Sequence, residues 1–287
     1  PWIFSGAIRI RFPGTFSQEI WLLSIALRDS FWLQAYFQLE NSLSGRVLSF
    51  DQRPVQEIIR EKIQKAWKLR FSMIDMSHTT CFRLINAEED GLPGLIVDYY
   101  DKVLVLQIST SGMQQLCRTV VNILVEEIKP RCIYEKSTSR ARTQEGLLPQ
   151  EGLLYGEEVS EQIVLENGIP FAVSIIDGQK TGFFLDQKEM RRRVGELSKG
   201  RKVLNCFSYS GGFSLYALHG GASHVTSVDI CSKAAALCQK NSDMGKFPKE
   251  MHTVCQEDVF SFLQRESMNS YDLIILDPPA FAKKDRK

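Results

Sequence analysis

The sequence lacks the residue patterns by which most metal sites and disulfide frameworks are identified. Its seven cysteines form no C-x-x-C pair, and its four histidines show no metal-ligand spacing. Because structural zinc sites carry such spacings, we expect no metal. The odd number of cysteines argues against a fully paired disulfide framework and favours buried, reduced thiols, as in a cytoplasmic protein.

Long hydrophobic runs and an excess of one charge are also missing. No apolar run approaches the ~20 residues of a membrane span, and the first residues show no signal-peptide pattern, so we expect no membrane contact. The net charge of +1 does not by itself indicate a nucleic-acid binder. Basic residues nevertheless cluster, and such patches either hold phosphates or are solvated helix faces. The clusters are Lys188, Arg191–Arg193 and Arg201–Lys202; Arg131, Lys136, Arg140 and Arg142; and Lys283–Lys287.

One stretch of the chain organises the rest. A strand-like run at Val203–Phe207 leads into a glycine turn, Ser208–Gly212, then a helix and a second strand that ends in Asp229. In a doubly wound sheet such a turn faces the ligand crevice. An acid about 20 residues later is placed to bind the hydroxyls of a ribose. An ordinary βαβ crossover with a glycine helix stop is the alternative.

The turn excludes two common classes of nucleotide site. It reads Ser-Tyr-Ser-Gly-Gly rather than G-x-G-x-x-G, and no G-K-[ST] follows. The sequence therefore matches neither the dinucleotide fingerprint nor the P-loop. A ligand with a ribose but no phosphates, such as S-adenosylmethionine, fits this turn better.

The last part of the chain alternates strands and helices, which predicts an α/β fold with a parallel sheet covered on both faces. Asp229, Asp258 and Asp277 follow successive strands, whose carboxyl ends meet at one crevice. Asp258 is placed to accept a hydrogen bond from an adenine amino group, and Asp277 to meet a cationic amino-acid end. Each acid alone is equally well a turn or helix cap. Because the fourth strand would have an exposed apolar edge, we expect further strands beyond Lys287.

A second signal directly follows that fourth strand. In Asp277-Pro278-Pro279-Ala280-Phe281 two prolines stiffen the backbone, and Phe281 is available to stack on a flat ring. Sites for a flipped base combine such stacking with hydrogen bonds to the base edge. A loop that merely ends a strand is the alternative.

The earlier parts of the chain carry less specific patterns. Residues 1–51 contain short β-like runs, among them Ile8–Phe12, which predict a small barrel or sandwich. Its size is marginal for independent stability, so it should pack on the next domain or begin before Pro1. Residues 52–160 predict helices and strands of an α+β domain, with a loop at 140–158. Asn167-Gly168 between apolar runs predicts a hairpin.

In combination these motifs resemble the class I S-adenosylmethionine-dependent RNA methyltransferases. The upstream motifs are similar to one branch, the large-subunit (23S) rRNA cytosine-C5 methyltransferases of the rRNA large subunit methyltransferase I family. The segments that carry the resemblance are Asn205–Phe213, Ser227–Asp229 and Asp277–Phe281, then Lys180–Gln187 and Glu89–Leu95, and at the N-terminus Pro1–Gly6 and Ser42–Phe50.

The resemblance implies three domains: a PUA-like RNA-binding domain at 1–51, a central α+β domain at 52–160 and a Rossmann-like methyltransferase domain at 161–287. It implies rRNA as the partner and leaves the oligomeric state open, with a homodimer as one candidate. The implied cofactor-binding residues are Phe184, Gln187, Asn205, Phe207, Ser208, Tyr209, Ser210, Gly211, Gly212, Asp229, Asp258 and Asp277. Asp277, Pro278 and Pro279 are implied at the catalytic position, and Phe281, Arg140 and Lys180 at the RNA.

The nucleophile for C5 chemistry is not apparent in this sequence. Carbon 5 of cytosine becomes nucleophilic only after a thiolate adds to carbon 6. Cys206 lies in the cofactor turn and is more simply a small buried side chain. The resemblance implies a cysteine beyond Lys287, so we expect residues 1–287 alone not to complete C5 methylation. Methylation of a guanine nitrogen, a non-catalytic RNA-binding or assembly factor, and a nicotinamide dehydrogenase are the competing functions; the missing dinucleotide fingerprint disfavours the last.

Overall fold

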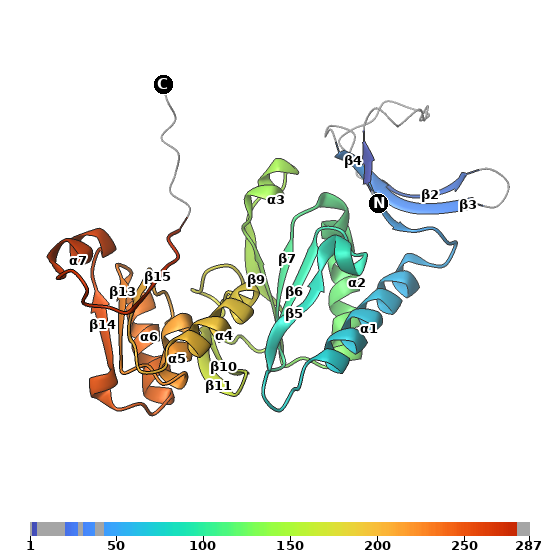
Figure 1. Cartoon of the computed structure of the whole chain (residues 1–287). Coiled ribbons are helices and arrows are strands. Elements are labelled where there is room, and N and C mark those ends of the chain that lie inside the picture. The colour runs from blue at the N-terminus through green and yellow to red at the C-terminus, as the bar shows by residue number, and fades with distance from the viewer. Residues whose placement is uncertain (1, 5–20, 28–30, 38–42, 280–287) are drawn as a thin grey trace, which may run out of the picture. The chain divides into compact units, whose positions relative to one another are not determined.

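The computed structural model describes residues 2–4, 21–27, 31–37 and 43–279. Phe281, the cluster Lys283–Lys287 and the predicted strand Ile8–Phe12 lie outside these residues. The chain forms two compact units (Figure 1). Unit 1 comprises Pro1–Gln162 and Ser174–Phe183, and unit 2 comprises Ile163–Val173 and Phe184–Lys287. The division into three domains at residues 51 and 160 stays a prediction.

The first sheet of unit 1 is antiparallel, with the strand order β1-β4-β3-β2. It is tied to the rest of unit 1 by Tyr36, whose hydroxyl donates to the Pro93 carbonyl at 2.8 Å. The predicted β-rich character of this region is confirmed for the described strands, whereas a PUA-like barrel stays a prediction. The strands are β1 (Trp2–Phe4), β2 (Trp21–Leu27), β3 (Phe31–Phe37) and β4 (Leu43–Ser49).

The second sheet of unit 1 is mixed, with the order β5-β6-β7-β8-β9 and only β7 and β8 parallel. Apolar side chains of α1 and α2, such as Ile63 and Leu124, pack with Leu84 and Leu106 of the sheet in one core. The elements are α1 (Val55–Met73), β5 (Cys81–Asn86), η3 (Ala87–Asp90), β6 (Leu95–Tyr100), β7 (Val103–Ile108), α2 (Ser111–Ile128), β8 (Cys132–Ser137), α3 (Arg140–Gln144) and β9 (Gln150–Gly156).

The expectation of a loop at 140–158 was wrong. The short helix α3 begins at Arg140, and β9 pairs antiparallel with β8 along the edge of the sheet. Most side chains of β9 are exposed. Only one face of β9 is partly buried, through Leu154, and its sequence does not alternate between apolar and polar residues, so the pattern that identifies half-buried strands is absent here.

The predicted hairpin is confirmed. It consists of β10 (Glu161–Glu166) and β11 (Ile169–Ser174). Asn167 and Gly168 join them with φ angles of 51° and 82°, and two such left-handed residues are what a type I′ turn requires.

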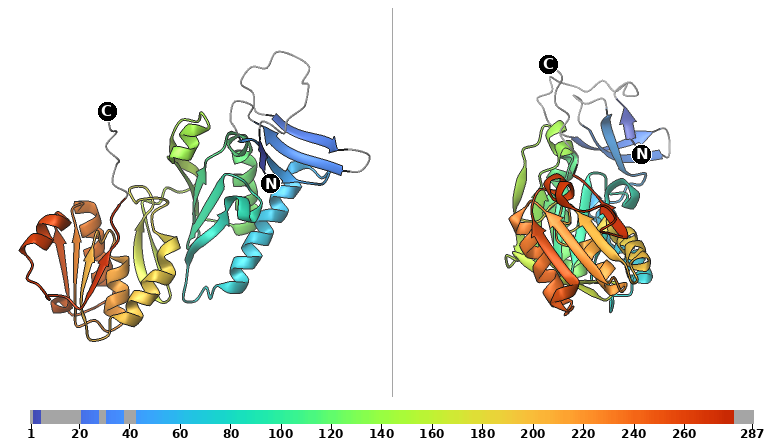
Figure 2. Two further views of the ribbon diagram at one scale, coloured as in Figure 1. Left: turned by 45° about the horizontal axis from the view of Figure 1, so that its top comes forward. Right: turned by 60° about the vertical axis from the view of Figure 1, so that its left-hand side comes forward.

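The sheet of unit 2 is fully parallel, with the order β14-β13-β12-β15 (Figures 1 and 2). Val203 and Val225 pack with α4 and α5, while Leu204 and Val228 pack with α7 on the opposite face. The predicted α/β fold with helices on both faces is therefore confirmed. The elements are η4 (Leu185–Gln187), α4 (Lys188–Leu197), β12 (Lys202–Cys206), α5 (Gly212–His219), β13 (His224–Asp229), α6 (Ser232–Met244), η5 (Lys249–Met251), β14 (His252–Gln256), α7 (Val259–Arg265) and β15 (Leu273–Leu276).

Within the described residues β15 lies at the edge of its sheet, and Ile274 and Leu276 are more than half exposed. Among the helices of those residues, none is both long and apolar enough to span a membrane.

Candidate functional site

The carboxyl ends of the parallel strands bring the predicted cofactor residues to one edge of the sheet. Cys206 is in register with Val228 on one side and with Leu276 on the other, and Asp229 is in register with Gln256. The segments that follow these strands therefore begin side by side. The crevice at such an edge is the ligand site of open α/β sheets.

The loop after β12 has an unusual backbone. Phe207, Tyr209 and Gly211 all have positive φ angles, of 56°, 47° and 80°. Left-handed conformations of non-glycine residues are unfavourable, persist only where the surroundings hold them, and cluster at functional sites. A side chain at Gly211 would be strained by the left-handed backbone, and its Cβ would lie 2.6 Å from the Cys238 sulfur, so the neighbouring groups would have to shift.

Asp229 is one of the groups that hold this loop. Its Oδ2 accepts a hydrogen bond from the Tyr209 backbone N–H at 2.8 Å, and its Oδ1 accepts one from the Cys231 N–H at 2.9 Å. The Ser208 N–H donates to the Val228 carbonyl at 3.1 Å. A carboxylate has about four acceptor positions, so Asp229 can still accept hydrogen bonds from a ligand.

Two hydroxyl groups of the loop are buried without a partner. The Ser208 and Ser210 side-chain oxygens have no hydrogen-bond partner within the described residues. Buried polar atoms of native proteins are nearly always paired. This pair of exceptions lies in the loop that the sequence identifies as the ligand turn.

Aromatic rings flank the loop on two sides. The Phe184 ring meets the Tyr209 ring edge-on, with centroids 5.5 Å apart, and Phe207 meets Phe260 in the same way at 6.2 Å. Gln187 is the last residue of η4, three residues after Phe184. The structure thus brings Phe184 to the predicted cofactor turn from a distant part of the sequence.

Asn205 and Asp258 also have structural roles. The Asn205 side chain is buried and donates to the Ser214 hydroxyl at 2.8 Å rather than lying open at the crevice. Asp258 caps α7, since its Oδ1 accepts from the Ser261 N–H at 2.9 Å. Helix capping was the alternative that the sequence left open for such acids, and it does not use all the acceptor positions of the carboxylate.

The other predicted site residues are exposed. Asp277, Pro278 and Pro279 follow β15 at the surface. Arg140, the first residue of α3, and Lys180 are exposed on unit 1. Phe281 lies outside the described residues.

Several residues of the predicted phosphate patches are instead buried, and for these the expectation was wrong. The Arg191 guanidinium forms two hydrogen bonds with the Glu166 carboxylate, at 2.8 and 2.7 Å, and both side chains are inaccessible to a ligand. The Arg142 side chain is buried, and its guanidinium contacts five acceptor oxygens. Lys136 is also buried and donates to backbone carbonyls. A sequence does not show which cations have internal partners.

A chain of neutral polar groups runs beneath the loop. The Ser214 hydroxyl bonds with the Ser227 hydroxyl at 2.6 Å, and Ser227 bonds with His252 Nε2 at 2.8 Å. His252 Nδ1 in turn bonds with the Ser242 hydroxyl at 2.7 Å. Burial is the main cause that lowers the pKa of His252 from 6.5 to about 4, so the imidazole is neutral at neutral pH.

A model of the S-adenosylmethionine-dependent methyltransferases matches residues 118–286, more than half of the chain. The chain belongs to this family. Within it, the chain belongs with the rRNA large subunit methyltransferase I proteins. It is 38% identical to ribosomal RNA large subunit methyltransferase I of Aliivibrio fischeri, over 99% of this chain and 72% of that protein. The protein of the same name from Pseudoalteromonas translucida is also 38% identical, over 98% of this chain and 72% of its own length.

Solved structures of methyltransferases are similar to this chain over most of its length. A Streptococcus mutans protein that has been assigned as SAM-dependent methyltransferase has a TM-score of 0.77 and 26% identity, with 97% of this chain and 72% of that one covered. Another protein with a methyltransferase assignment, solved in complex with SAH, has the same TM-score and 27% identity, over 96% of this chain and 71% of that one.

The cofactor of this methyltransferase is therefore S-adenosylmethionine, and the residues of the loop fit it. The two unpartnered serine hydroxyls offer hydrogen bonds, and Asp229 retains acceptor positions at the carboxyl end of β13. These groups can bind a ligand that carries no phosphate. Within the described part of the chain no cluster of three His, Cys, Asp or Glu side chains is arranged to hold a metal.

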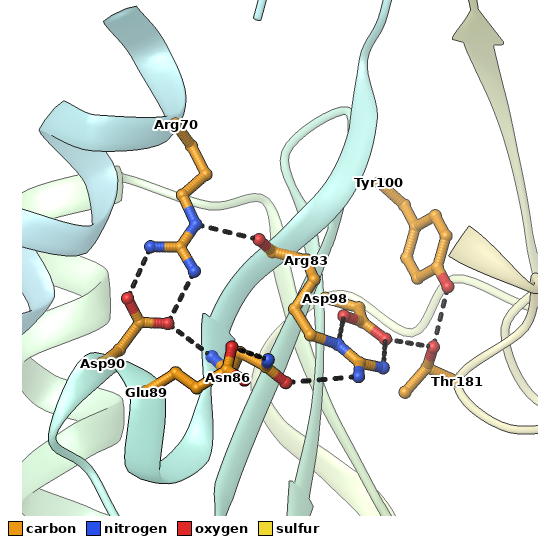
Figure 3. Close-up of polar contacts among 8 residues, drawn as sticks. All are labelled: Arg70, Arg83, Asn86, Glu89, Asp90, Asp98, Tyr100 and Thr181. Carbon is orange, nitrogen blue, oxygen red and sulfur yellow. Dashed lines mark hydrogen bonds and ion pairs between the residues drawn. The ribbon is translucent and has the colours of Figure 1, made fainter. Parts of the chain in front are cut away.

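The two upstream motifs of this methyltransferase branch meet in one polar network in unit 1 (Figure 3). Arg70 of α1 forms two hydrogen bonds with Asp90, at 2.5 and 2.6 Å. Arg83 of β5 forms two with Asp98 of β6, at 2.9 and 3.2 Å. Thr181 then donates to Asp98 Oδ2 at 2.7 Å. Asp90 comes from one motif and Thr181 from the other, which is a relationship that neither motif shows alone.

A buried lysine fixes the same returning segment of unit 1. Lys136 Nζ donates to the carbonyls of Ile175 at 2.9 Å and Ile176 at 2.8 Å, and also to that of Gly178. Burial lowers the pKa of Lys136. Together with Thr181, this lysine explains why Ser174–Phe183 belongs to unit 1 although unit 2 flanks it in the sequence.

Proposed function

We propose that this enzyme transfers the methyl group of S-adenosylmethionine to large-subunit rRNA in the cytoplasm, at carbon 5 of a cytosine. The relatives named above support the rRNA substrate, and the free cysteines support the location. The observation that carries the proposal is the strained loop with two unpartnered buried hydroxyls beside Asp229.

The loop Phe207–Gly212 would hold the methionine part of the cofactor, Asp229 its ribose and Asp258 its adenine. The cofactor supplies an electrophilic methyl group. Phe184 and Gln187 would line the pocket, and Asn205 would support the loop from beneath through Ser214. A rigid site of this kind binds its ligand without first having to order itself.

Asp277, Pro278 and Pro279 would face the target base, with Phe281 stacked on it. The exposed cations Arg140 and Lys180 would contact RNA phosphates, which contribute most of the salt-dependent affinity of such complexes. Residues 1–51 would form a PUA-like RNA-binding domain, supported by the antiparallel sheet β1-β4-β3-β2. The central and methyltransferase domains would then follow at 52–160 and 161–287.

Carbon 5 chemistry requires a thiolate that adds to carbon 6 of the base. Cys206 does not suit this role, because it is buried and burial raises its thiol pKa. A thiolate nucleophile needs the opposite shift. We therefore expect the nucleophile to be a thiol other than Cys206.

The test is the transfer of labelled methyl from S-adenosylmethionine to unmodified large-subunit rRNA by the full-length protein, followed by identification of the labelled nucleoside. The proposal predicts 5-methylcytidine. Labelled methylguanosine would keep the cofactor site and overturn the cytosine assignment. No label on naked rRNA or on assembled subunits, together with no cofactor binding, would leave a non-catalytic RNA-binding factor.

A further inference from the structure

One carbonyl of the cofactor loop lies between two left-handed residues. Ser210 follows Tyr209, with a φ of 47°, and precedes Gly211, with a φ of 80°. Within the loop the N–H of this peptide donates to the Ser208 carbonyl at 2.9 Å, whereas a group outside the loop holds its carbonyl. The group that does so comes from α6.

Asn241 of α6 is fully buried and contacts the loop directly. Its Nδ2 donates to the Ser210 carbonyl at 2.8 Å. Its Oδ1 accepts a hydrogen bond from the Ala172 backbone N–H at 2.7 Å. The β11 strand therefore fixes the orientation of the amide, and the amide fixes the Ser210 carbonyl.

A second contact between α6 and the loop lies one helical turn earlier. The Cys238 sulfur lies 2.6 Å from the position that a Cβ on Gly211 would take. Residues three apart share one face of a helix, so Cys238 and Asn241 present a single surface to two consecutive residues of the loop. This surface fixes both the path of the loop and the direction of its carbonyl.

We propose that Asn241 is a positioning residue for S-adenosylmethionine. It holds the strained loop in its binding conformation before the cofactor arrives, without touching the cofactor itself. Such preorganisation increases affinity because binding no longer pays for ordering the loop. The inference rests on the proposed role of the loop as cofactor site. The sequence gives no signal for it, since Asn241 lies in an otherwise polar stretch of α6.

The test compares Asn241→Ala with Ser242→Ala. Ser242 is the next residue of the same helix and is also buried, but its side-chain hydroxyl hydrogen-bonds with His252 rather than with the loop. Each variant loses buried hydrogen bonding, so both should unfold at lower temperature than the wild type. We expect Asn241→Ala to raise the Kd for S-adenosylhomocysteine about tenfold, measured by calorimetry well below the unfolding temperature. Ser242→Ala should stay within about twofold of the wild type. Equal Kd values for the two variants would overturn the inference.

A second measurement does not depend on the cofactor. Hydrogen exchange of the backbone amides at 207–211 in the free protein should be faster in Asn241→Ala than in the wild type and unchanged in Ser242→Ala. Unchanged exchange in Asn241→Ala contradicts the positioning role. If the wild type binds no S-adenosylhomocysteine, the proposed cofactor site fails, while the exchange measurement still decides whether Asn241 holds the loop.

Discussion

Two polar networks of this protein are built from different groups. In unit 1 the network of Figure 3 joins two arginines to two aspartates, Arg70 to Asp90 and Arg83 to Asp98. Beneath the cofactor loop of unit 2 a series of hydrogen bonds connects Asn205 to Ser242. Its members are serine hydroxyls, an amide and a neutral histidine.

The difference follows from what each network holds. The charged network joins whole elements (α1, β5, β6 and the returning segment Ser174–Phe183), and its loss affects stability. The neutral network lies below a site that receives a cationic cofactor, where an additional fixed charge would alter ligand binding. Hydrogen bonds between neutral groups connect the strands and helices below the loop without adding a fixed charge.

The largest effect should come from breaking the charged network at Asp98. Asp98 is almost fully buried and accepts two hydrogen bonds from Arg83 and one from Thr181. Asp98→Ala leaves the partly buried guanidinium without its counter-ion, and we expect a loss of about 3 kcal/mol in the free energy of unfolding. Denaturant unfolding measures this loss.

Asp75→Ala is the control for that measurement. Asp75 pairs with His78 at the surface, and both side chains are about two-thirds exposed. Exposed pairs contribute little, so the loss should be far smaller than that of Asp98→Ala. If both variants lost the same amount, the charged network of unit 1 would have no special structural importance.

The neutral network should fail when its histidine is protonated. The pKa of His252 is about 4 in the folded protein, against an ordinary value of 6.5. The unfolded chain therefore binds more protons between these values, so stability is complete above about pH 6.5 and falls as the pH drops toward 4. The full shift corresponds to roughly 3 kcal/mol, and this loss is complete only below about pH 4. The comparison is the pH dependence of unfolding in the wild type and in His252→Asn, and identical slopes between pH 6.5 and 4 would exclude His252 as the cause.

The smallest effect should come from the surface of α4. Arg192 pairs with Glu189 and Glu196, and its side chain is half exposed. Arg192→Ala should change the free energy of unfolding far less than Asp98→Ala does. A loss comparable to that of Asp98→Ala would show that exposure does not separate the strong ion pairs of this protein from the weak ones.

Much of unit 2 could be predicted from the sequence because its signals are local. The strand predicted at Val203–Phe207 is β12, shifted by one residue, and the second predicted strand, β13, ends in Asp229 as expected. Hydrophobic periodicity and the glycine turn fix these elements. The parallel order of the sheet then follows from right-handed crossovers.

The features that were missed depend on contacts between residues far apart in the sequence. β9 is exposed on an edge and has no alternation. Lys136, Arg142 and Arg191 read as surface charges, yet each has buried partners that only the fold brings near. Asn241 reads as an ordinary polar residue of a helix, although its amide holds the cofactor loop.

The most direct test of the central claim is the titration of S-adenosylhomocysteine into the wild-type protein and into Asp229→Asn, with Asp243→Asn on the exposed surface of α6 as the control. If the loop after β12 and Asp229 form the cofactor site, the wild type and the control bind equally, and Asp229→Asn raises the Kd by at least about tenfold. Equal binding by all three proteins would contradict the placement of the cofactor at this loop.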